Sequence, residues 1–138
     1  MEKYDFLGYA KNLIKNDTSE VAIRVVISRS YYSCFYHSID LMKPDYINSD
    51  EWKSLKFGDH KKLIYSLHHY YGCHGYVPKK LAAKVANKLN YLKTMRQDAD
   101  YDLKSPQTVL QANQVINESD KLIELINSLE VSSEKAQA

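Results

Sequence analysis

Apolar residues recur at every third or fourth position along most of this chain, with lysine, glutamate, asparagine and serine between them. This spacing is typical of amphipathic helices that each turn one face toward a core. Serine, threonine, aspartate or asparagine stands just before several of these segments, as helix N-caps do. The pattern predicts helices over Tyr4 to Lys15, Glu20 to Met42, Glu51 to Tyr71 with an interruption at residues 57–60, Pro78 to about Asp98, and Ser105 to about Leu129. We therefore expect an all-α fold, a bundle of four to five helices.

The second predicted helix, Glu20 to Met42, is apolar on nearly every side instead of along one stripe. Such a helix is usually surrounded by others, so we expect it at the centre of the bundle. Arg29 stands in its middle, one turn from apolar residues on one side and from tyrosine on the other. A buried arginine must be paired or must reach solvent through a cleft. Arg29 is therefore either part of a structural ion pair or a residue that contacts a ligand.

Length and composition indicate one domain over residues 1–130, followed by a polar tail at residues 131–138 that we expect to be flexible. Segments Lys43 to Asp50 and Gly72 to Pro78 carry the proline, glycine, asparagine and serine typical of loops. No run reaches the roughly 18 apolar residues of a membrane span. The first residues also lack the apolar core of a signal peptide. The sequence also has only two cysteines, too few for a disulfide framework. We therefore predict a cytoplasmic protein that does not enter a membrane.

Charge is unevenly distributed, although the formal net charge is only +2. Between Lys53 and Arg96 there are ten lysines and arginines and one aspartate, whereas the segments before and after are acidic overall. Such a run is often a solvated helix face, and it is also typical of a surface that binds a polyanion such as RNA. On the second interpretation, the residues that would hold a nucleic-acid backbone include Lys61, Lys62, Lys88 and Lys93.

Histidine and cysteine residues gather near one predicted loop, where His68, His69, Cys73 and His74 lie within seven residues. Zinc takes cysteine and histidine ligands, and a structural site needs four of them in a closed tetrahedron. The spacing fits no familiar two-plus-two pattern, so we expect no metal and no other cofactor. Cys34 stands in the most apolar helix, where a thiol is usually inert.

Tyrosine is unusually frequent, with twelve in 138 residues. Tyrosine rings can stack on the unpaired bases of single-stranded RNA. They also fill helical cores while their hydroxyl groups reach the rim or a dimer interface. For Tyr31 and Tyr32 we favour a place in the core or in an interface.

Mixed charge is concentrated at the end of the fourth predicted helix, in KTMRQDADYDL from Lys93 to Leu103. Arg96 and Asp100 are four residues apart and share one face if the helix continues. Tyr101 lies about 140° from Arg96 around an ideal helix, so a joint site requires the helix to end or bend there, or a second subunit. The segment is either a salt-bridge cluster at a helix end or a site where an arginine holds a phosphate beside groups that manage protons.

Three segments, in order, resemble the HEPN superfamily. They are SRSYYSCFYHSIDLM in the second predicted helix, FGDHKKLIYSL at residues 57–67, and LKTMRQDADYDL at residues 92–103. The likeness runs over about Glu20 to Leu129 and is closest to small bacterial and archaeal members with an A-Y-Y-A-x-F helix and an R-x-x-A-D-Y ending. The resemblance implies an up-and-down bundle that usually forms a homodimer. It also implies a place in a toxin–antitoxin, CRISPR or phage-defence module.

Many HEPN proteins are metal-independent endoribonucleases with an Arg-x4-6-His motif. Others are toxins partnered by a nucleotidyltransferase-type antitoxin, and some are non-catalytic. Arg96 matches the motif's arginine, but its histidine window falls on Tyr101, Asp102 and Leu103. Histidine titrates near 6.5 and shuttles protons at neutral pH, whereas tyrosine, near 10, is a poor base.

The resemblance therefore leads to two hypotheses. The first is an RNA-directed protein, an endoribonuclease if the degenerate motif is active, with Arg96, Asp100 and Tyr101 at the reaction and Arg29 and the lysines binding substrate. The alternative is a non-catalytic module that binds a nucleotide or works with a nucleotidyltransferase-type partner.

Overall fold

The computed structural model describes residues 2–42, 44–56, 58–69 and 77–137, without the side chains of residues 44, 45 and 130–137. Over these residues the chain forms helices and no strand, which confirms the all-α prediction. The helices are α1 Asp5–Asn16, α2 Glu20–Ile39, α3 Pro44–Ile47, α4 Asp50–Ser54, α5 Asp59–His69, α6 Lys79–Tyr101 and α7 Val109–Gln137.

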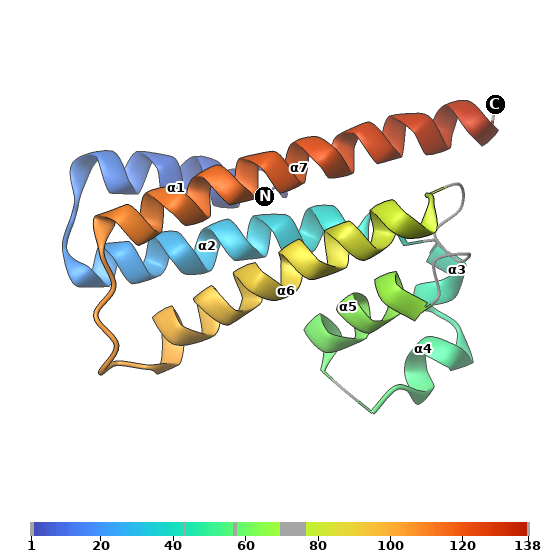
Figure 1. Ribbon diagram of the computed structural model, residues 1–138, viewed down its shortest axis with the longest axis horizontal. Coiled ribbons are helices and arrows are strands. Elements are labelled where there is room, and N and C mark those ends of the chain that lie inside the picture. The colour runs from blue at the N-terminus through green and yellow to red at the C-terminus, as the bar shows by residue number, and fades with distance from the viewer. Residues whose placement is uncertain (1, 43, 57, 70–76, 138) are drawn as a thin grey trace.

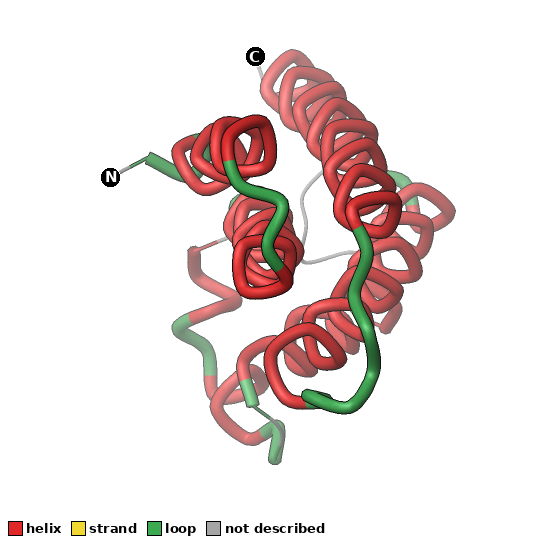
Figure 2. Tube along the Cα trace, turned by 90° about the vertical axis from the view of Figure 1, so that its left-hand side faces the viewer, coloured by secondary structure: helices red, strands yellow, loops and turns green. Residues whose placement is uncertain are grey.

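The long helices α1, α2, α6 and α7 follow the long axis of the molecule, and each runs opposite to the one before it (Figure 1). The shorter helices α3, α4 and α5 lie together near one end, below α6 in that view. An end-on view shows α1 and α7 on the same side of α2, with α6 on another (Figure 2). Because α2 contacts α1, α5, α6 and α7, its predicted central position is confirmed.

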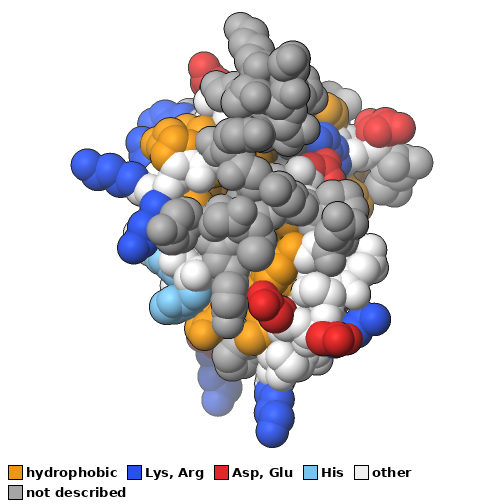
Figure 3. All heavy atoms as spheres, turned by 90° about the vertical axis from the view of Figure 1, so that its right-hand side faces the viewer, with side chains coloured by type: hydrophobic (Ala, Val, Ile, Leu, Met, Phe, Trp, Pro, Cys, Tyr) orange, Lys and Arg blue, Asp and Glu red, His pale blue; other side chains and the backbone are white. Residues whose placement is uncertain are grey.

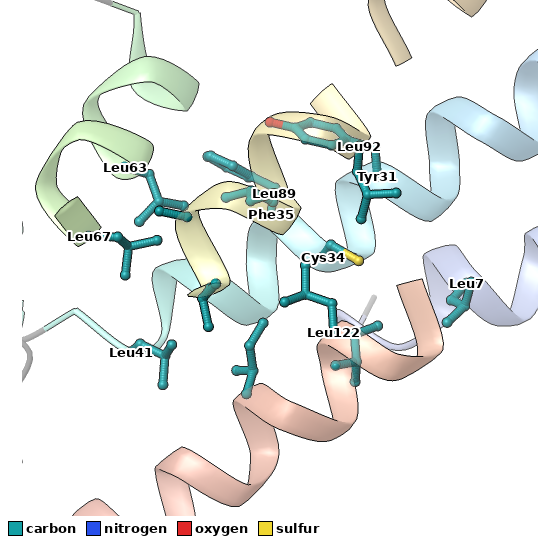
Figure 4. Packing of buried hydrophobic residues seen from close by; sticks show 14 of the residues in the cluster. Leu7, Tyr31, Cys34, Phe35, Leu41, Leu63, Leu67, Leu89, Leu92 and Leu122 are labelled. Carbon is teal, nitrogen blue, oxygen red and sulfur yellow. The ribbon is translucent and has the colours of Figure 1, made fainter. Parts of the chain in front are cut away.

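The core forms where leucines of the outer helices meet aromatic residues of α2. Figure 4 shows Leu63 of α5 and Leu89 of α6 pointing toward the side of α2 that carries Tyr31 and Phe35. Leu63, Leu89 and Tyr31 are fully buried. Truncating a buried leucine to alanine costs about 2–5 kcal/mol, since transfer free energy is lost and a cavity remains. This packing holds α5 and α6 against the same face of α2.

The N-terminus of α7 differs from the prediction because of a reciprocal cap. The helix begins at Val109, not at Ser105, since Thr108 serves as its N-cap. The Gln111 amide donates to Thr108 Oγ1 at 3.2 Å, and the Thr108 amide donates to Gln111 Oε1 at 2.7 Å. This is the capping-box arrangement, which satisfies two backbone donors at once. At its other end α7 continues to Gln137, beyond the predicted end at Leu129.

Other boundaries differ less. The segment Lys43 to Asp50, predicted as a loop, contains the short helix Pro44–Ile47. The predicted interruption is present but lies earlier than residues 57–60, because α4 ends at Ser54 and α5 begins at Asp59, so that Asp59 and His60 are helical. The second predicted loop, Gly72 to Pro78, falls largely outside the described residues. None of the helices, over their described residues, combines the length and the apolar character needed to cross a membrane.

Candidate functional site

Arg96 lies on the face of α6 that packs against α2, and its side chain is buried at 6% exposure. Its guanidinium carbon is 5.4 Å from the ring centre of Tyr31 and 5.8 Å from that of Tyr32. The two tyrosines therefore hold the cation by its attraction to the aromatic rings. They belong to the core, as predicted, and they also form one wall of the Arg96 site.

Asp100, one turn further along α6, fixes one edge of the Arg96 guanidinium. Arg96 Nη1 is 3.6 Å from Asp100 Oδ2, and the same carboxylate oxygen accepts a hydrogen bond from Ser28 Oγ at 3.2 Å. The other edge is less satisfied, because the buried Arg96 Nε finds no acceptor within the described part of the chain. Leaving a charged donor buried without a partner is unfavourable, so this edge of the guanidinium is not balanced by the neighbouring residues.

Tyr101 also reaches Arg96, and it does so at the place where the helix ends. The last helical residue is Tyr101, and Asp102 then leaves the helical conformation at φ −93° and ψ 83°. The helix end that a joint site required is therefore present, slightly beyond Asp98 as predicted. The Tyr101 ring centre is 5.8 Å from the guanidinium carbon, and the side chain is 74% exposed. Tyr101 thus covers the outer side of Arg96 while remaining open to solvent.

The inner side of Arg96 opens onto a hollow between the start of α5 and the last turns of α6. We call it the basic hollow; its volume is about 370 Å³ and its lining consists of Lys56, Gly58, His60, Lys61, Lys93, Arg96 and Gln97. It brings together the candidate residues Arg96, Lys61 and Lys93 from two helices. It also contains a histidine that the sequence analysis did not place at the site.

That histidine is His60, in the first turn of α5. Its ring packs on Phe35 with centroids 4.3 Å apart, and its Nδ1 is 2.6 Å from the Tyr31 hydroxyl oxygen. Burial lowers the pKa of His60 below its ordinary value of 6.5, and the positive charges of Arg96 and Lys93 lower it further. His60 is therefore neutral at physiological pH, with Nδ1 held by Tyr31.

Burial likewise raises the pKa of Tyr31, so its hydroxyl group stays neutral, and its oxygen can accept the hydrogen bond when the His60 proton is on Nδ1. The position of His60 had a local signal in the sequence. It precedes the inward-facing Leu63, Ile64 and Leu67 by three, four and seven residues, the spacing of one helix face. What periodicity could not indicate was which residues of α2 and α6 the ring would meet.

Lys93 carries a second unbalanced charge in the basic hollow. Its side chain is buried at 7% exposure, and among the described residues no carboxylate lies within ion-pair distance of its ammonium group. Burial lowers the pKa of Lys93, and the neighbouring charges of Lys61 and Arg96 add to the effect. Clustered cations of this kind favour a bound anion, which would relieve their repulsion.

The other candidate residues are spread over the molecule. Arg29 lies with its guanidinium carbon 5.1 Å from the ring centre of Tyr32, the same ring that contacts Arg96. Lys62 lies over the Trp52 ring at 5.6 Å, outside the basic hollow. Lys88 faces Glu118 of α7 at 3.6 Å, in a separate depression between α6 and α7. Figure 3 shows histidine atoms on the same edge of the molecule as lysine or arginine atoms.

Arg24, which sequence reasoning missed, fastens the end of α6 that carries Asp100 and Tyr101. Its guanidinium donates to four backbone carbonyl groups, those of Asp98, Ala99, Asp102 and Ser105, at 2.7–3.3 Å. Glu20 pairs with the same guanidinium at 2.9 Å. A positive charge at a helix C-terminus satisfies carbonyl groups that have no partner within the helix, and it complements the helix dipole.

Histidine and cysteine residues were the remaining candidates for chemistry. His68 and His69 end α5 with ring centres 6.2 Å apart, while Cys73 and His74 lie outside the described residues. Within the described ranges, no three histidine, cysteine, aspartate or glutamate side chains are grouped as a metal site requires. Burial raises the pKa of the Cys34 thiol to about 12, which agrees with an inert core position.

Comparisons of the chain with protein-family models, with curated proteins and with solved structures find no match.

Proposed function

We propose that this chain is a HEPN-like protein of a toxin–antitoxin or defence module that binds RNA by a phosphate at the basic hollow. In this proposal Arg96 and Lys93 hold the phosphate, and the exposed Lys61 guides the strand toward them. His60 then allows the bound strand to be cut without a metal ion.

The observation that carries the proposal is that His60, Lys93 and Arg96 open onto one hollow although they come from two helices. The motif at the end of α6 has tyrosine where catalytic HEPN proteins have histidine. A neutral histidine beside the buried arginine supplies the missing proton-transfer group from another part of the chain. Asp100 and Tyr101 then position the Arg96 guanidinium.

The proposed reaction is an internal transesterification. In the tautomer whose Nδ1–H donates to the Tyr31 hydroxyl oxygen, His60 Nε2 is unprotonated and takes the proton of the ribose 2′-hydroxyl. The resulting oxygen nucleophile attacks the adjacent phosphorus. The new bond to the 2′-oxygen replaces the bond to the 5′-oxygen, so the products are a 2′,3′-cyclic phosphate and a 5′-hydroxyl end. The proton taken by His60 returns to the leaving 5′-oxygen. Arg96 and Lys93 stabilise the charge that develops on the phosphoryl oxygens.

The test is cleavage of unstructured RNA by the purified chain in EDTA, with the ends of the products identified by mass spectrometry. We expect cyclic phosphate ends and no cleavage of an RNA that carries 2′-deoxyribose at the cut position. In His60→Gln the cleavage rate should be lower by at least about 100-fold. Lys88→Gln is the matched control for Arg96→Gln, since Lys88 belongs to α6, as Arg96 does, but lies outside the hollow. Cleavage that requires a metal ion, or that proceeds equally in His60→Gln and Arg96→Gln, would refute the proposed chemistry.

A second candidate role is that of an interaction module, and it is favoured by exposed apolar side chains at the end of the bundle where α6 ends and α7 begins. Tyr101, Leu103 and Leu110 are 70–77% exposed, and Val21 at the start of α2 is 73% exposed. We propose that a second copy of the chain covers these residues and forms the expected homodimer. A nucleotidyltransferase-type partner is the alternative occupant. Sedimentation velocity should show a dimer that Leu103→Glu dissociates; a monomeric wild type would refute the homodimer.

A further inference from the structure

A second depression adjoins the basic hollow on the outer face of α5 and α6. Its volume is about 300 Å³, and Lys61 and Lys93 belong to the linings of both hollows. Unlike the basic hollow, its remaining wall is largely aromatic and aliphatic, from Ile64, Tyr65, His68 and His69, with the amide of Asn90 at its side. We call this second depression the aromatic depression.

The aromatic ring in this wall is held in place by a neighbour. The rings of Tyr65 and His69, one helical turn apart, have centroids 4.3 Å apart and an interplanar angle of 38°. Tyr65 is half-buried, so its ring is fixed by its surroundings and still reaches the depression. A flat ring that is already ordered loses little conformational freedom when it receives a planar ligand.

We propose that the aromatic depression receives the base of one unpaired nucleotide whose phosphate lies in the basic hollow. The proposal rests on the proposed function, because the shared Lys61 and Lys93 would hold the phosphate that joins the two positions. Tyrosine and histidine rings stack on nucleobases of any kind, and the Asn90 amide can donate to or accept from a base edge.

Single-stranded RNA is thereby the substrate class. A base within a duplex is already stacked and paired, so it cannot enter a depression at the side of the phosphate site unless it is first flipped out.

The experiment measures the binding of short 2′-O-methyl oligonucleotides, which have no free 2′-hydroxyl and therefore cannot be cut. A fluorescent single strand, its duplex and an abasic strand of equal length are titrated with the full chain. We expect the base-bearing strand to bind about ten-fold or more tightly than the abasic strand, as one stacked base provides. We expect the duplex to bind no better than the abasic strand.

In Tyr65→Ala the preference for the base-bearing strand should disappear while binding of the abasic strand is unchanged. Tyr65→Phe should retain the preference, and Tyr9→Ala, an exposed tyrosine on α1, is the matched control. If Tyr65→Ala weakens both strands equally, or if the wild type shows no preference for bases, the base subsite is refuted.

Arg96→Gln separates this failure from that of the proposed function. If the phosphate site is right, this variant weakens the base-bearing and abasic strands by the same factor. If Arg96→Gln binds both strands like the wild type, the phosphate role of Arg96 is refuted. A wild type that binds no strand refutes both the phosphate site and the base subsite.

Discussion

Replacing Arg24 with methionine should loosen the end of the bundle where α6 meets the loop to α7. The variant keeps a long apolar side chain and removes every donor that reaches the four carbonyl groups. A hydrogen bond from a charged donor contributes about 1.5–3 kcal/mol, and a cation at a helix C-terminus contributes up to about 2 kcal/mol. Glu20, which is 57% exposed, loses only a surface partner.

The expected decrease in the free energy of unfolding is about 2–4 kcal/mol, well below a simple sum over the four hydrogen bonds, because freed carbonyl groups near the surface regain water. This corresponds to a fall in Tm of about 10 °C for a chain of this size. Urea unfolding followed by far-ultraviolet circular dichroism measures the free energy. Hydrogen exchange of the amides at residues 98–105 should accelerate more than that of α2.

Arg29→Met is the matched control, because Arg29 belongs to the same helix as Arg24. Its guanidinium contacts an aromatic ring and, among the described residues, no carbonyl group. Its cost should be about 0.5–1 kcal/mol. Arg24→Lys retains the charge but cannot reach every carbonyl group, so it should fall between the two. If Arg24→Met and Arg29→Met destabilise the protein equally, the capping role assigned to Arg24 is wrong.

Three further predictions follow from the pKa shifts and the charge cluster. The pKa values of His37 and His60 are lowered in the fold, so the unfolded chain binds more protons below about pH 6.5. The free energy of unfolding in urea should therefore decrease as the pH falls through that range and change little between about pH 7 and 8; a free energy of unfolding that increases on acidification would contradict this. In a Cys73→Ser background, Cys34 should react with a thiol reagent only after unfolding, and a reaction in native buffer at the rate of a free thiol would contradict its burial. Inorganic phosphate at ten times its Kd should stabilise the wild type by about 1.4 kcal/mol, seen as a rise in Tm, and Lys93→Gln should abolish this rise; persistence of the rise would place the anion elsewhere.

Local sequence patterns predicted what one helix can decide. The four-residue spacing of Arg96 and Asp100 and the apolar surface of α2 both led to correct placements. The start of α7 could also have been predicted, because Thr108 and Gln111 form a capping box. However, Ser105 and Pro106 are a competing helix-start signal three residues earlier. Where two capping signals compete, tertiary contacts decide between them.

Contacts between helices could not be derived in this way. Nothing in the spacing of His60 indicated that its ring would meet Tyr31 and Phe35 or share a hollow with Lys93. Periodicity predicts which face of a helix turns inward but not which partner lies opposite. The same limit applies to Arg24, whose partners are separated from it by most of the central part of the chain.

That separation has a consequence for the order in which the chain folds. Arg24 bonds to carbonyl groups 74–81 residues further along, so its contacts close a long loop of the chain. Long loops are slow to close, and their contacts tend to form late on the folding path. Removing a late contact mainly accelerates unfolding and leaves the rate of folding nearly unchanged. The hydrogen bonds of Arg24 are therefore expected to slow unfolding of the native protein more than they accelerate its folding.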